Sequence, residues 1–152
     1  MNDICETGIS RRVATTGPDA GALSAVLEAA GRLRERLDAA LNEVGLSISK
    51  FDAIDQLISA DEPLTLGDLA GRLHCVRSNI TQLVDRLEAE GLVKRGTCSE
   101  DRRAVRAKVT PVGEERHAAG VAAIRAVQAA FAGKFEAGDR DRLVRLLSTL
   151  SG

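Results

Sequence analysis

Aromatic residues are the scarcest feature of this sequence, which has three Phe and neither Trp nor Tyr. A core built from Leu, Val, Ile and Ala instead suits packed helices better than a β-sandwich. No apolar run approaches the roughly 20 residues of a membrane span, and residues 1–16 lack the apolar stretch of a secretory signal. The three cysteines, Cys5, Cys75 and Cys98, do not form a disulfide framework. A reducing cytoplasm is therefore the simplest setting for this chain.

Excess charge of either sign is also lacking, because the formal net charge is only −1. Its distribution is more informative. Residues 64–110 carry nine basic and six acidic side chains, whereas residues 1–63 carry six basic and eleven acidic. Positive charge is thus concentrated where a phosphate backbone could bind, with an ordinary solvated surface as the alternative. The length of 152 residues fits a single domain.

The first half of the chain shows two helical patterns. Apolar residues recur in steps of three and four over residues 23–44, and Gly45 then suits a helix stop. Ser47 or Ser49 can cap a second helix, which should end near Ala60 because Pro63 disfavours helix just before it.

The middle of the chain, residues 64–110, predicts two short helices followed by a hairpin. Residues 64–73 and 77–90 carry helical apolar stripes, with Thr65 as the cap of the first and Gly91 as the stop of the second. Apolar and basic residues then alternate over residues 104–109, with residues 92–95 as the partner strand. The sequence therefore predicts a helix-turn-helix with a basic β-wing, a unit that places one helix in a DNA major groove.

Two further helices are predicted after the wing. Thr110 and Pro111 have the residue types of an N-cap and a first helical position. After a break between Gly133 and Gly138, Asp139 can cap a last helix with an apolar stripe. The fold class is thus mainly α with a small β-wing: a winged helix-turn-helix lobe plus terminal helices.

Several motifs resemble those of the MarR family of regulators. Residues 83–95 (LVDRLEAEGLVKR) resemble the end of that family's recognition helix, and the Asp101-Arg102-Arg103 tip and residues 109–113 are similar to its wing and wing exit. Gly45-Leu46-Ser47 with Phe51 resembles the entry to its second helix. The resemblance spans roughly residues 23–150.

The resemblance implies a homodimeric transcription factor. Residues 19–152 would be a single regulator domain, preceded by residues 1–18, whose polar composition itself predicts a flexible arm or a short helix packed on a partner. Within that domain, residues 46–110 would bind DNA, and residues 19–45 and 111–152 would interlock two subunits. Arg103 would enter the minor groove, braced by Asp101. The dimer should bind a pseudo-palindromic operator with half-sites about 10 bp apart.

Residues of the second short helix are candidates for reading DNA. Asn and Gln can bind adenine edges, and Ser or Thr can bind bases or phosphate; the candidates are Arg77, Ser78, Asn79, Thr81 and Gln82. Six basic residues are candidates for phosphate contacts, although some must instead pair with neighbouring carboxylates: Arg86, Lys94, Arg95, Arg102, Arg106 and Lys108. The family usually has a capping residue where this chain has Val76, which cannot cap. The helix therefore begins at Arg77, with a bound phosphate satisfying its free amides, or begins instead at Ser78.

The leading hypothesis is a repressor released by an unknown small-molecule effector, bound in a cleft lined by the first, second and fifth helices. One alternative is a regulator switched by oxidation of Cys75 or Cys98. Another is a winged-helix protein–protein module that does not bind DNA. The spacing of His74, Cys75, Cys98 and His117 fits no standard zinc pattern, so no metal is expected. No cofactor is expected, and no nucleophile–base arrangement indicates an enzyme.

Overall fold

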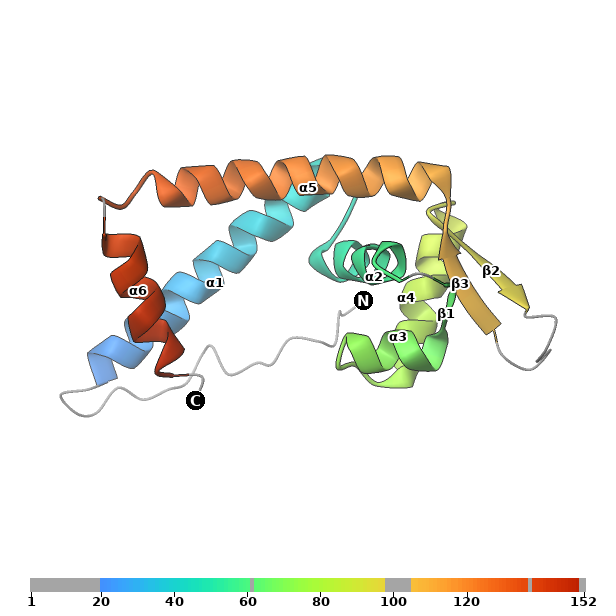
Figure 1. Cartoon of the computed structure of the whole chain (residues 1–152), viewed down its shortest axis with the longest axis horizontal. Helices are drawn as coiled ribbons and strands as arrows, with labels where there is room; N and C mark the ends of the chain where they lie inside the picture. Colours follow the sequence, from blue (N-terminus) through green and yellow to red (C-terminus); the bar gives the residue numbers. More distant parts are fainter. Residues whose placement is uncertain (1–19, 61, 98–104, 137, 151–152) are drawn as a thin grey trace.

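The computed structural model describes residues 20–60, 62–97, 105–136 and 138–150, and places them in two regions. The winged-helix lobe contains α2 (Ile48–Ile58), β1 (Leu64–Thr65), α3 (Leu66–Arg72), α4 (Arg77–Ala89), β2 (Val93–Thr97) and β3 (Val105–Val109). The helical arm contains α1 (Ala20–Glu43), α5 (Pro111–Ala132) and α6 (Asp139–Ser148). Figure 1 shows α5 extending from the sheet along the whole length of the arm. The predicted fold class is confirmed, whereas the predicted arm of residues 1–18 lies outside the described residues.

Hydroxyl side chains begin three of the helices, as predicted. Ser47, rather than Ser49, caps α2 by accepting the Lys50 amide, and Thr65 accepts the Asp68 amide at the start of α3. Thr110 caps α5, with Pro111 directly after it. Each cap satisfies an amide that the helix itself leaves unbonded.

The glycine stops are confirmed, but the predicted cap of the last helix is wrong. Gly45 and Gly91 have φ of 75° and 72°, a left-handed conformation that glycine adopts without strain. Gly138, with φ of 93°, occupies the N-cap position of α6 and offers no side-chain cap. Asp139 lies instead in the first turn, where its negative charge favours the positive end of the helix.

The sheet has three antiparallel strands in the order β1-β3-β2. The strand β1 was not predicted; it pairs Leu64 with Ala107 and Thr65 with Arg106. The strand β2 begins one residue later than predicted and continues to Thr97. The sheet therefore fastens the wing to the segment that enters α3, so the wing is part of the lobe rather than an isolated ribbon.

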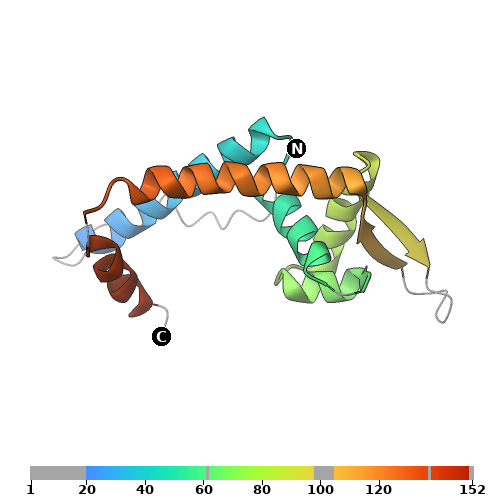
Figure 2. The same cartoon turned by 45° about the horizontal axis from the view of Figure 1, so that its top comes forward.

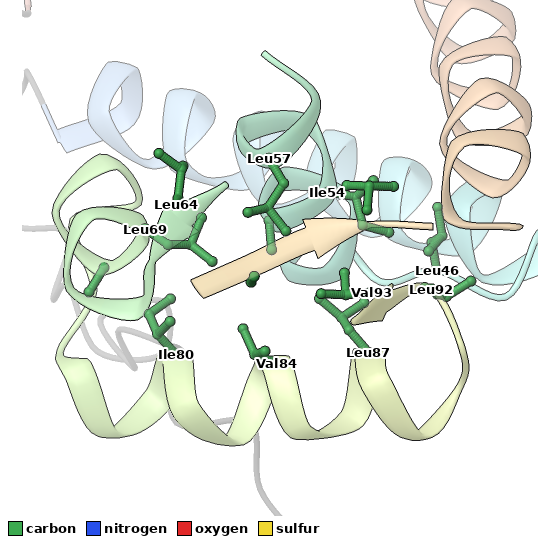
Figure 3. Packing of buried hydrophobic residues seen from close by; sticks show 14 of the residues in the cluster. Leu46, Ile54, Leu57, Leu64, Leu69, Ile80, Val84, Leu87, Leu92 and Val93 are labelled. Carbon is green, nitrogen blue, oxygen red and sulfur yellow. The ribbon is translucent and has the colours of Figure 1, made fainter. Parts of the chain in front are cut away.

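The hydrophobic core lies almost entirely inside the lobe. Figure 3 shows side chains of α4 pointing at those of α2, α3 and the sheet. Ile80, Val84 and Leu87 are buried along one face of α4, which confirms most of its predicted stripe. The α1 residue Leu41 joins this cluster, so α1 is anchored to the lobe at its C-terminal end.

The helical arm, in contrast, leaves many apolar side chains exposed. No described residue of α6 is buried. Figure 2 shows α6 at the end of α5 that lies away from the lobe. Large apolar side chains are exposed on α1 and on the last part of the chain: Leu23, Leu27, Val144, Leu146, Leu147 and Leu150. None of the described helices combines the length and the apolar character needed to cross a bilayer.

Candidate nucleic-acid interface

The helix α4 begins at Arg77 with an uncapped N-terminus. Val76 occupies the N-cap position in an extended conformation, is 63% exposed and gives no side-chain hydrogen bond. Of the two starts considered from the sequence, the structure therefore has Arg77 rather than Ser78 as the first helical residue. Amides at an uncapped and exposed helix start are suited to an anion such as phosphate.

The polar side chains of α4 are distributed around the face opposite the core. With about 100° between successive residues, Ser78 and Gln82 point most directly away from Ile80 and Val84. Both Ser78 and Gln82 are exposed, as are Arg77 and Arg86, whereas Asn79 is half-buried. The structure thus brings two of the five predicted base-reading residues, Ser78 and Gln82, onto one outward surface.

Thr81 lies on the flank of this surface and uses its hydroxyl within the helix. The hydroxyl donates to the carbonyl of Arg77 at 3.1 Å. Such a bond to the preceding turn occupies the only proton that the hydroxyl can donate. A contact of Thr81 with DNA would therefore use the hydroxyl as an acceptor.

The described basic residues of the wing fall into two groups, according to whether their side chains have partners within the described part of the chain. Lys94 and Lys108 are directly opposite each other on the outer face of the β2–β3 pair, and both are exposed. Neither ammonium has a hydrogen-bond or ion-pair partner within the part of the chain that the structure describes. Like charges opposite each other repel, so this pair is a site where an anion would be stabilising.

Arg95 and Arg106 are engaged within the lobe. Arg95 lies on the inner face with the buried Val93 and pairs with Asp85 and Glu88 of α4. Arg106 donates to the carbonyl of Pro63 at 2.8 Å, which joins β3 to the segment before β1. For Arg95, the alternative of pairing with neighbouring carboxylates is thus the observed one. Alternation along β2, which gives Arg95 the same strand face as Val93, is the sequence signal that could have indicated this inward position.

The wing-tip residues cannot be placed. Cys98, Asp101, Arg102 and Arg103 lie outside the described residues. Cys75, the described cysteine, packs partly buried against the core. Within the described ranges no group of three His, Cys, Asp or Glu side chains could hold a metal ion.

The joint between the lobe and α5 contains a contact that sequence reasoning missed. The ring of His117 on α5 stacks on Phe51 of α2, with centroids 4.9 Å apart, and its Nε2 lies 2.9 Å from Oδ1 of Asp55. Gly120 makes room for this contact, because a Cβ there would lie 2.8 Å from the Phe51 ring. His117 is 62 residues from Asp55 in the sequence, so no local pattern indicates that α5 and α2 meet there.

Two acidic residues of α2 lie close together beside this joint. Partial desolvation and the nearby Asp55 carboxylate raise the pKa of Asp52, and Arg34 of α1 opposes the rise.

Elsewhere, a cavity of about 340 Å³ opens between α1 and the end of α5. The cavity differs from the predicted effector cleft, because no residue of α2 lines it. Its lining residues are Ala25, Glu28, Ala29, Arg32, Leu33, Arg36, Phe131 and Lys134.

Comparison with known proteins finds similarity to transcriptional regulators over the winged-helix lobe. The family model described as MarR family matches residues 46–105. The HTH-type transcriptional regulator PrsX of Escherichia coli is 31% identical over 83 residues, which are 54% of this chain and 50% of PrsX. The chain spans about half the length of the curated relatives it matches.

Solved structures share the fold over most of the chain. The transcriptional repressor CouR, bound to a 23-mer DNA duplex, superposes with a TM-score of 0.77 at 21% identity, covering 89% of this chain and 96% of CouR. The MarR family transcription regulator SP03579 gives a TM-score of 0.76 at 21% identity, covering 86% of each chain. The MarR family model thus matches the part of the chain that forms most of the winged-helix lobe, and the solved structures show that the fold extends to the helical arm.

Proposed function

We propose that this protein is a homodimeric, sequence-specific DNA-binding transcriptional regulator of the cytoplasm, a repressor released by a small-molecule effector. The observation that carries the proposal is the outward polar surface of α4 beside a pair of exposed lysines that have no ion-pair partner among the described residues. Ser78 and Gln82 have the hydrogen-bonding groups that read base edges. Lys94 and Lys108 supply the positive charge that phosphate contacts need. CouR, whose fold this chain shares, is a repressor that binds a DNA duplex.

The exposed apolar faces of the helical arm support the homodimer. Leu146 and Leu150 of the last segment are 59% and 69% exposed, and Leu23 of α1 is 51% exposed. Large apolar side chains exposed together on these helices are typical of an interaction site. A second copy of the arm would bury these faces and hold two α4 helices at a fixed separation, as a pseudo-palindromic operator requires.

The proposed effector site lies at the junction between the winged-helix lobe and the helical arm. A ligand between α1, α2 and α5 would change the angle of the lobe and so the distance between the two α4 helices. Such a ligand shifts the population between DNA-competent and DNA-incompetent dimers. Screening compounds for those that raise the melting temperature of the purified protein identifies candidates. A true effector among them should also release the operator.

The test of the central proposal is fluorescence anisotropy with a duplex from the protein's own promoter region and a scrambled duplex. We expect preference for the promoter duplex, and affinity that falls steeply with salt as phosphate contacts release counterions. Gln82→Ala should weaken specific binding by about fivefold to a hundredfold, the range for losing one base contact.

Ser59→Ala is the control, because Ser59 is exposed at the end of α2, outside α4, the wing and the helical arm. It should bind both duplexes like the unmodified protein. Equal affinity for the two duplexes, or no binding to either, would refute the proposal. The latter result would favour the protein–protein module instead.

A further inference from the structure

Arg95 connects the wing to the recognition helix α4 through several contacts. Its Nη2 lies 2.5 Å from Oδ1 of Asp85 and donates to the carbonyl of Thr81 at 3.1 Å. Its backbone amide donates to Oε1 of Glu88 at 3.0 Å, and its Nε lies 3.6 Å from Oε2 of the same carboxylate. One residue of β2 therefore binds three successive turns of one flank of α4.

This flank adjoins the outward surface of α4. With about 100° between residues, Thr81, Asp85 and Glu88 fall within about 60° of one another, and Ser78 and Gln82 follow next around the helix. The position at which Arg95 is held thus determines how the wing is rotated relative to the side chains that face DNA.

The local charge argues against a direct contact of Arg95 with phosphate. Two carboxylates surround one guanidinium, so the group as a whole is negative. The Arg95 side chain is only 25% exposed, and its Nε is buried without a hydrogen bond. Reaching a phosphate would require Arg95 to leave Asp85 and Glu88 unpaired beside DNA, where they would repel it.

We propose that Arg95 is a positioning residue for DNA recognition, which fixes the wing against α4 and acts on DNA only through that contact. This inference rests on the proposed DNA-binding function. It differs from a phosphate role in one measurable respect. Removing a phosphate contact lowers the salt dependence of binding, whereas loosening the wing lowers specific affinity without changing the number of released counterions.

The experiment measures affinity for promoter and scrambled duplexes over a range of salt concentrations. Arg95→Gln should lower specific affinity about tenfold, within the range of losing one recognition contact. Its binding to the scrambled duplex and the slope against salt concentration should match those of the unmodified protein. Lys94→Gln is the matched comparison, because Lys94 precedes Arg95 on the strand but is exposed and has no partner among the residues that the structure describes. If Lys94 contacts phosphate, its slope should fall by about one.

Asp85→Asn gives a test whose sign distinguishes the two roles and serves if Arg95→Gln does not fold. Removing a negative charge near DNA should tighten binding if only electrostatics matter. Removing the partner of Arg95 should weaken specific binding if Arg95 positions the wing. Arg95→Gln with a slope lowered by about one, or with unchanged specific affinity, would overturn the inference, as would tighter specific binding by Asp85→Asn. Absence of specific binding by the unmodified protein would instead refute the proposed function.

Discussion

Replacing Gly113 by alanine should separate α5 from the base of the wing. Gly113 is buried in the first turn of α5, and its amide donates to the capping hydroxyl of Thr110 at 3.1 Å. An added Cβ would lie 2.1 Å from the carbonyl oxygen of Leu92 and 2.8 Å from Cγ1 of Val109. The first of these atoms belongs to the backbone and cannot rotate away, so the helix itself must move.

The expected cost follows from what the movement disrupts. The same Leu92 carbonyl accepts the amide of Thr110 at 3.1 Å, and the Thr110 hydroxyl donates to the Gly91 carbonyl at 2.7 Å. Overpacking a tight site costs about 1–3 kcal/mol, and a weakened hydrogen bond adds about 1 kcal/mol. The better helix propensity of alanine returns at most about 1 kcal/mol. Gly113→Ala should therefore lower the free energy of unfolding by about 1–3 kcal/mol.

Urea unfolding followed by circular dichroism, at one protein concentration, measures this change. Gly71→Ala is the matched control, because Gly71 is exposed in α3 and nothing lies within 4 Å of its added Cβ. That variant should be more stable by about 0.5–1 kcal/mol. If Gly113→Ala were as stable as Gly71→Ala, the close approach of α5 to Leu92 would not exist in solution.

Three further predictions concern other parts of the fold. Ser47→Ala should cost about 1 kcal/mol of stability by urea unfolding, through loss of the α2 cap; an unchanged midpoint would contradict that role. Because the folded pKa of Asp52 is raised, stability should fall as pH rises above 3.8, the ordinary value, and stay lower at neutral pH. Asp52→Asn should therefore be the more stable protein at pH 7 and match the unmodified protein below 3.8. Leu146→Glu should give monomers in sedimentation experiments while the lobe keeps its circular dichroism spectrum, and a persisting dimer would exclude α6 from the interface.

Most of the helices could be predicted from the sequence because the residues that start and stop a helix act on their immediate neighbours. Ser47 and Thr110 bind amides three residues away, so their residue type and position suffice to identify a helix start. The short strand β1 was missed because its residue Leu64 pairs with Ala107 of β3, which is distant in the sequence. Asp139 has the residue type of a cap, but the left-handed Gly138 takes that position.

The candidate site was predictable in residue type but not in pairing. Exposed polar residues on α4 and basic residues in the wing follow from periodicity. The assignment of Arg95 to Asp85 and Glu88, and of His117 to Asp55, depends on how elements pack in three dimensions. A single sequence gives the charge of each side chain but not which opposite charge lies within reach.

The uninterrupted course of α5 has a mechanical consequence. Its 22 residues form one rod that begins at the wing and ends beside the part of the chain that leads to α6. At 1.5 Å per residue this rod is about 33 Å long, so a tilt of only about 5° displaces its far end by about 3 Å. A slight tilt of α5 at one end therefore moves its other end by a distance comparable to the separation of adjacent base pairs.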